Sequence, residues 1–90
     1  MAQIKENKKG FKVIQISQKE LVEKLGEHGA VGICDYCGKA ASNGYYIAVL
    51  NSWYCPHCYI EWYNRATYYK EDKNIEERNF NYFKSLFGIE

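Results

Sequence analysis

The sequence predicts a small α+β domain, and three observations support this fold class. The chain has 90 residues, which is the size of one domain. Some stretches are rich in β-branched and aromatic residues, whereas others repeat their apolar residues with a helical period. Four cysteines occur as two Cys-x-x-Cys pairs, and so short a chain needs such a staple because its core is small. We therefore expect short strands and helices held together partly through the cysteines.

The N-terminal part predicts a tail, a strand and a helix. Residues 1–10 are polar and lysine-rich, and we interpret them as a flexible tail. Residues 11–16, FKVIQI, are largely β-branched and apolar and predict a strand. Ser17 and Glu20 have the spacing of a capping box, in which the serine caps the amide of the glutamate. A short helix should follow and stop at Gly26.

The middle of the chain predicts a β-hairpin that leads into a helix. Residues 29–33 form a short strand candidate. Residues 45–49 and 53–55 read as the two arms of the hairpin, with the turn between them. Pro56 suits the first turn of a helix, where its missing N–H costs nothing. The residues that would share one face of this helix, and pack as core, are Tyr59, Trp62, Tyr63, Ala66 and Tyr69.

The C-terminal part predicts a further apolar helix. Asn74 and Glu77 resemble a second capping box, and Gly88 would end the helix. Whether the chain breaks near residues 72–74 or continues as one long helix stays open. Residues 11–90 are expected to form one domain. The apolar positions of this helix are Ile75, Phe80, Phe83, Leu86 and Phe87.

The cysteine spacing predicts a metal site. Cys34 and Cys37 are separated by 17 residues from Cys55 and Cys58. No export signal is recognisable at the N-terminus, so we expect a cytoplasmic protein whose thiols stay reduced. Two such pairs are then typical of metal ligands. Zinc prefers four soft ligands in a tetrahedron, and four cysteines would close that tetrahedron. The expectation is one structural Zn²⁺ per chain and no enzymatic activity.

The two pairs should differ in backbone conformation. Gly38 follows the first pair and allows positive φ, so that backbone amides turn towards the sulfurs. Tyr59 follows the second pair, and a bulky aromatic residue there fits a helix. The positive end of that helix would favour thiolate charge. His57 is expected to face solvent, since the cysteines already complete the site.

The chain thus has a Cys-x-x-Cys turn, a hairpin, and a second Cys-x-x-Cys turn that continues into a helix. This order is the treble-clef arrangement, and it resembles the GATA-type zinc finger and the zinc modules of LIM domains. The resemblance covers about a third of the chain, and its features are Cys-x-x-Cys-Gly, the 17-residue gap and the aromatic pair Trp53 and Tyr54. It implies a zinc module over residues 31–72, with the N-terminal strand and helix and the C-terminal helix packed onto it. The DNA contacts of the GATA family do not carry over, because residues 45–50 contain no arginine or lysine.

The expected function is that of a zinc-stabilised interaction module with a protein partner or a second copy of the chain. The C-terminal aromatic residues would leave part of their surface available for this. The alternative is a nucleic-acid-binding zinc finger, with Lys12, Arg65 and Lys70 as a basic face. No run of about 18 apolar residues is present, so no membrane partner is expected.

Two further alternatives concern the segment Cys55-Pro-His-Cys58. It is similar to the active-site motif of DsbA-type thiol–disulfide oxidoreductases, which is also followed by a helix. Those folds place a βαβ unit before the motif and a cis-proline opposite it, whereas the single proline here is Pro56, inside the motif. A rubredoxin-like iron site is the other rival, but that family has glycine where this chain has Tyr59. Zinc is therefore the preferred metal.

Overall fold

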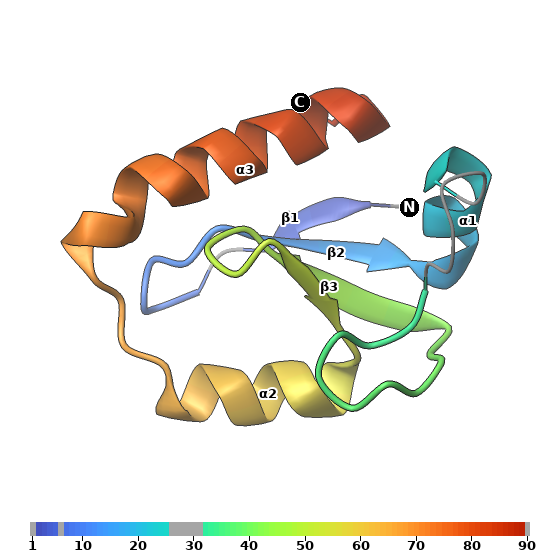
Figure 1. Cartoon of the computed structure of the whole chain (residues 1–90), viewed down its shortest axis with the longest axis horizontal. Helices are drawn as coiled ribbons and strands as arrows, with labels where there is room; N and C mark the ends of the chain where they lie inside the picture. The colour runs from blue at the N-terminus through green and yellow to red at the C-terminus, as the bar shows by residue number, and fades with distance from the viewer. Residues whose placement is uncertain (1, 6, 26–31, 90) are drawn as a thin grey trace.

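A computed structural model describes residues 2–5, 7–25 and 32–89 and shows an antiparallel sheet with helices on both of its faces (Figure 1). The four strands lie in the order β1-β2-β3-β4, so each strand pairs with its neighbour in the sequence. The elements are β1 (Gln3–Lys5), β2 (Val13–Ser17), α1 (Gln18–Leu25), β3 (Asn43–Ile47), β4 (Ser52–Tyr54), α2 (Pro56–Arg65), the 3-10 helix η2 (Lys70–Asp72) and α3 (Lys73–Phe87). The fold is therefore α+β, as the sequence predicts.

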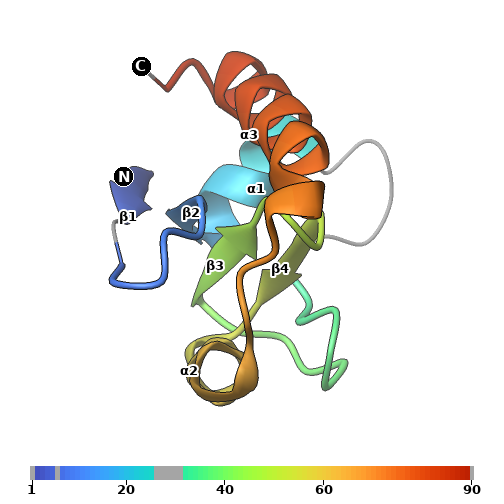
Figure 2. The same cartoon turned by 90° about the vertical axis from the view of Figure 1, so that its left-hand side faces the viewer.

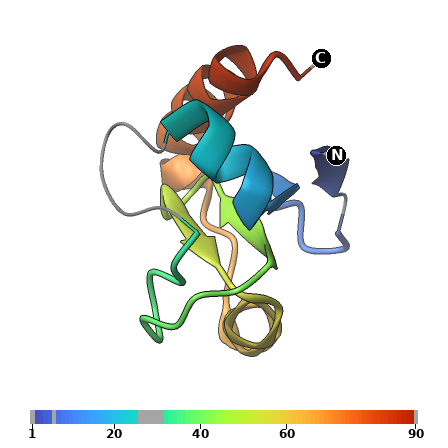
Figure 3. The same ribbon diagram turned by 90° about the vertical axis from the view of Figure 1, so that its right-hand side faces the viewer.

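The strands bury both faces of the sheet. Successive side chains point to opposite faces. Thus Val13 belongs to a cluster with Trp62 of α2, whereas its neighbour Ile14 belongs to a second cluster with Phe80 of α3. Figure 2 shows α2 end-on below the sheet, with α1 and α3 above it, and Figure 3 shows the same layers from the opposite side. Two small cores therefore share one sheet.

Residues 2–5 and 7–10 differ from the expected tail. Strand β1 pairs antiparallel with β2, with Ile4 opposite Ile14. The turn that follows is closed by the Asn7 side chain, which donates to the Phe11 carbonyl at 2.8 Å and accepts from the Phe11 amide at 3.0 Å. A strand of three residues is too short to be recognised from its sequence. Its pairing with β2 is what stabilises it.

Lys9 also has a role that the tail interpretation missed. Its Nζ donates to the Ala66 carbonyl at 2.8 Å and to the Tyr63 carbonyl. These carbonyls lie at the C-terminal end of α2, where a helix leaves acceptors unpaired and favours positive charge. The N-terminal segment therefore caps α2 and ties it to the sheet.

The predicted start of α1 is confirmed. The Glu20 amide donates to the Ser17 hydroxyl oxygen at 3.2 Å, and the helix begins at Gln18. Leu21 of this helix packs into the α3-side cluster. The expected stop at Gly26 and residues 29–31 of the expected strand lie outside the described residues.

The predicted hairpin is also confirmed, with β3 and β4 as its arms. Asn51 adopts a φ of 51° in the turn, a conformation that asparagine tolerates better than most residues. Gly44 is required by packing, because a Cβ atom there would lie 2.4 Å from the Trp53 ring. The Trp53 indole N–H in turn donates to the buried Ile16 carbonyl at 3.1 Å. These contacts fix the register between the hairpin and β2.

The chain breaks between α2 and α3, earlier than residues 72–74. Helix α2 ends at Arg65, and an extended stretch then carries the chain from one face of the sheet to the other (Figure 1). The interpretation of Asn74 as a cap is wrong, because the N-cap of α3 is Asp72 and its side chain makes no capping bond. Gly88 ends α3 with a φ of 67°, as expected.

The residues predicted to share one face of α2, here called the aromatic stripe, pack as core up to the end of the helix, as expected. The Tyr59 ring stacks on Tyr45 of β3 at a centroid distance of 4.3 Å. Trp62 lies against Phe11 at 4.7 Å. Tyr69 is exposed, because it lies beyond the helix end and the helical period no longer applies to it. The stripe therefore attaches α2 to the lower face of the sheet.

Candidate metal centre

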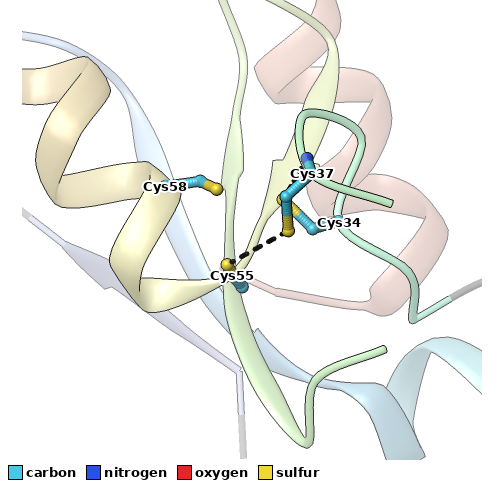
Figure 4. Close-up of side chains that lie close together, drawn as sticks. All are labelled: Cys34, Cys37, Cys55 and Cys58. Carbon is cyan, nitrogen blue, oxygen red and sulfur yellow. Dashed lines mark hydrogen bonds between the residues drawn. The ribbon is translucent and has the colours of Figure 1, made fainter. Parts of the chain in front are cut away.

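The four cysteines gather beside the N-terminus of α2, and they come from two separate parts of the chain (Figure 4). Cys34 and Cys37 lie in a loop whose ends are joined by a β-bridge between Ile33 and Ala40. Cys55 is the N-cap of α2, and Cys58 lies in its first turn. All four sulfur atoms lie within 4.8 Å of one another.

The spacing of the sulfurs fits one tetrahedral ion. A Zn–S bond of about 2.3 Å gives a separation of about 3.8 Å between any two sulfurs of a regular tetrahedron. The Sγ atoms of Cys37 and Cys55, one from each pair, are 3.9 Å apart. The four cysteines are therefore positioned to bind one metal ion.

The loop around the first pair directs amides at a sulfur. The backbone N–H groups of Tyr36 and Cys37 donate to Cys34 Sγ at 3.4 and 3.5 Å. Gly38 has a φ of 75°, and its N–H donates to the Cys34 carbonyl at 2.9 Å. The predicted glycine turn is confirmed, and amides of this kind favour the thiolate form of a metal-binding cysteine.

The two buried thiols have opposite pKa shifts. Burial opposes ionisation of Cys34, but the backbone amides, that of Cys37 first, outweigh it and lower the pKa of this thiol to about 6. Burial raises the pKa of the Cys58 thiol, and its sulfur neighbours act in the same direction. Four thiolates in this space would repel one another, and a bound metal cation would supply the countercharge.

The start of α2 brings the second pair into place. Pro56 occupies the first helical turn, and the Tyr59 amide donates to the Cys55 carbonyl at 2.9 Å. The helical conformation after the second pair is thus confirmed. The N-terminal end of the helix carries partial positive charge and faces the sulfurs.

Asp35 is a site residue that the sequence reasoning missed. It lies between the two cysteines of the first pair, and its Oδ2 accepts from the Trp53 amide at 2.8 Å. Its own amide donates to the Trp53 carbonyl at 2.9 Å. These two bonds attach the loop to the outer edge of β4. An aspartate in a turn is a recognisable signal, but its partner 18 residues away is not.

The remaining polar groups near the helix start stay outside the cluster. His57 is exposed, as expected, and its Nε2 lies 3.3 Å from Glu61 Oε1, one turn along α2. Cys37 is the exposed member of the cysteine set, whereas Cys34 and Cys58 are buried. The site therefore lies at the surface on its Cys37 side.

Comparison of the chain with protein-family models, with curated proteins and with solved structures finds no match. What defines the protein is thus its own geometry: a small α+β fold carrying a four-cysteine site that is positioned for one metal ion. Among the described residues, no helix is long and apolar enough to cross a membrane.

Proposed function

We propose that the site holds one structural Zn²⁺ and that the metal module has the treble-clef arrangement. The observation that carries this proposal is the approach of four cysteine sulfurs to within 4.8 Å of one another. Four thiolates complete the tetrahedron of zinc and leave no position for a substrate, so the role is structural and not enzymatic. The order of loop, β3–β4 hairpin and α2 supports the treble clef.

The zinc module serves, in this proposal, a domain that binds another protein or a second copy of itself. A groove of about 320 Å³ lies between α3 and the metal loop. Its lining includes Ile33 of the loop and Tyr82 and Leu86 of α3, and Ile33 and Tyr82 are exposed. Exposed apolar side chains around a groove are typical of a surface that binds protein.

Two observations count against the other functions. The described sheet is entirely antiparallel, whereas a thioredoxin-like oxidoreductase is built on a βαβ unit. Two residues expected to form one basic face lie over different aromatic rings. Arg65 lies over the Tyr36 ring, and Lys12 lies over the Phe80 ring of α3. A protein partner is therefore preferred to nucleic acid.

Metal analysis of the purified protein tests the zinc proposal. We expect one zinc per chain, and we expect a chelator to unfold the metal module, because structural zinc contributes on the order of 10 kcal/mol to folding. Cys34→Ser and Cys58→Ser should abolish stoichiometric zinc. The matched control is His57→Ala, next to Cys58, which should retain it. A thermal transition that chelator leaves unchanged at neutral pH would exclude a structural metal.

A further inference from the structure

Three lysines lie around the region where the β1–β2 turn meets α3. The ammonium groups of Lys12 and Lys84 lie 5.2 and 5.1 Å from the centroid of the same ring, that of Phe80. Lys5 lines the same region from β1. In the described part of the chain none of these three lysines forms an ion pair. Lysines gathered in one region without acidic partners among the described residues favour binding of an anion there.

A pocket lies beside these lysines. Its volume is about 380 Å³, within the range of sites for small organic ligands. Ile4, Phe11 and Phe80 give it an apolar wall, and Lys5 and Lys12 line it as well. The pocket thus combines a cationic part with an apolar part.

Among the described residues, the carboxylate of Glu76 accepts a hydrogen bond close to these lysines. Glu76 is fully buried and does not line the cavity. Its Oε2 accepts from the Lys12 amide at 2.9 Å, and its Oε1 accepts from the Tyr68 hydroxyl at 3.4 Å. Among the described residues, the lining of the pocket thus contains two lysines and no acidic side chain.

We propose that this pocket binds a small organic phosphate. The phosphate would lie among Lys5, Lys12 and Lys84, and the apolar portion of the ligand would contact Ile4 and Phe11. Ammonium groups bind phosphate oxygens through charge-assisted hydrogen bonds. The site is distinct from the metal centre and from the groove proposed for a protein partner.

Binding of phosphate probes to the zinc-loaded chain tests this inference. The probes are adenosine monophosphate, phenyl phosphate and inorganic phosphate at low ionic strength, with adenosine as the uncharged comparison. We expect one of the two organic phosphates to shift the amide resonances of residues in the β1–β2 turn. It should bind about tenfold more tightly than inorganic phosphate, because only it reaches the apolar wall. Adenosine should produce no shifts in this turn.

Charge-removing variants locate the site. Lys12→Gln and Lys84→Gln should each weaken the binding about tenfold, since each removes one charge-assisted bond. Lys19→Gln removes the same charge from the exposed face of α1 and should leave the affinity unchanged. Lys12→Gln keeps the backbone N–H that donates to Glu76 Oε2, so the fold is preserved. The inference is overturned if neither organic phosphate shifts the turn at millimolar concentration, if inorganic phosphate binds equally well, or if Lys19→Gln is as harmful as Lys84→Gln.

Discussion

Asp35 shows how a single residue positions the metal loop. It is the first residue between Cys34 and Cys37, and its side chain and backbone both bond to Trp53 at the edge of β4. An edge strand offers unpaired backbone groups, and Asp35 satisfies one donor and one acceptor there. The first cysteine pair is therefore placed by the sheet as well as by its own turn.

Replacement of Asp35 tests this role. Asp35→Ala leaves the Trp53 amide without its acceptor and should lower the free energy of unfolding by about 2 kcal/mol. Asp35→Asn retains a side-chain oxygen and should recover most of the loss. The measurement is urea unfolding of the zinc-loaded protein. If alanine and asparagine were both as stable as the parent, the bond to Trp53 would not position the loop.

The surroundings of Tyr46 predict the pH at which its hydroxyl ionises. Its ring stacks on Phe83 at 3.8 Å, and its hydroxyl donates to Asn51 Oδ1 at 2.6 Å. Burial raises the pKa of Tyr46 from 10.0 to about 12. The folded state therefore keeps the phenol neutral where the unfolded chain would ionise it.

The pH dependence follows from the sign of this shift. Because the folded pKa exceeds the unfolded one, the contribution of Tyr46 to stability is complete below pH 10 and is lost as the pH rises through about 12. The difference in tyrosinate absorbance between the parent and Tyr46→Phe should isolate this late titration. A difference curve centred near pH 10 would show that the ring is accessible to solvent.

At the scale of elements, Glu76 joins three segments that are far apart in the sequence. It lies in the first turns of α3, and it accepts from the Lys12 amide just before β2 and from the Tyr68 hydroxyl in the crossing segment. A buried carboxylate persists where such bonds replace its hydration. These bonds set where the chain leaves α2 and where α3 begins.

Replacement of Glu76 should weaken the attachment of α3 to Lys12 and to Tyr68. Glu76→Ala leaves two donors without an acceptor and should lower the free energy of unfolding by about 2 kcal/mol or more. Glu76→Gln keeps one acceptor oxygen and should cost less. Glu77→Ala, at the next and only partly buried position, is the control and should be near neutral. Equal stability of the alanine variants at 76 and 77 would contradict the role of Glu76, as measured by denaturant unfolding.

For the whole molecule, the aromatic residues of α3 divide between core and surface. Phe80 and Phe83 are 8% and 7% exposed, so they belong to the core and not to the aromatic surface expected for a partner. Tyr82, by contrast, is 69% exposed and lines the groove beside the metal loop. An interface on α3 would therefore use Tyr82 and not Phe83.

These two neighbours give a matched test of the interaction proposal. Phe83→Ala opens a cavity in the core and should cost about 3 kcal/mol or more of stability. Tyr82→Ala should change stability by about 0.5 kcal/mol or less, yet weaken association in sedimentation experiments. A strict monomer, together with salt-sensitive nucleic-acid binding that Arg65→Ala abolishes, would instead support the nucleic-acid function.

Features that depend on neighbouring residues were predictable from the sequence alone. The capping box at Ser17, the positive φ at Gly38 and the helix start at Pro56 each follow from chemistry within a few residues. The spacing of the two cysteine pairs also predicts the four-cysteine cluster, because each pair forms its own turn and the hairpin between them brings the two turns together. Gly88 ends α3 for a local reason as well, since only a residue tolerant of positive φ fits there.

The tertiary structure decided what depends on distant partners. Strand β1 exists because β2 pairs with it, and the Lys9 ammonium caps α2 because the sheet brings the two ends together. Asp35 and Glu76 acquire their roles from partners 18 and 64 residues away. The sheet is buried on both faces because the chain crosses over between α2 and α3, and no local pattern shows on which face the second helix will pack. Contacts of this kind depend on the register and closure of the whole chain, which the order of residue types within one segment does not contain.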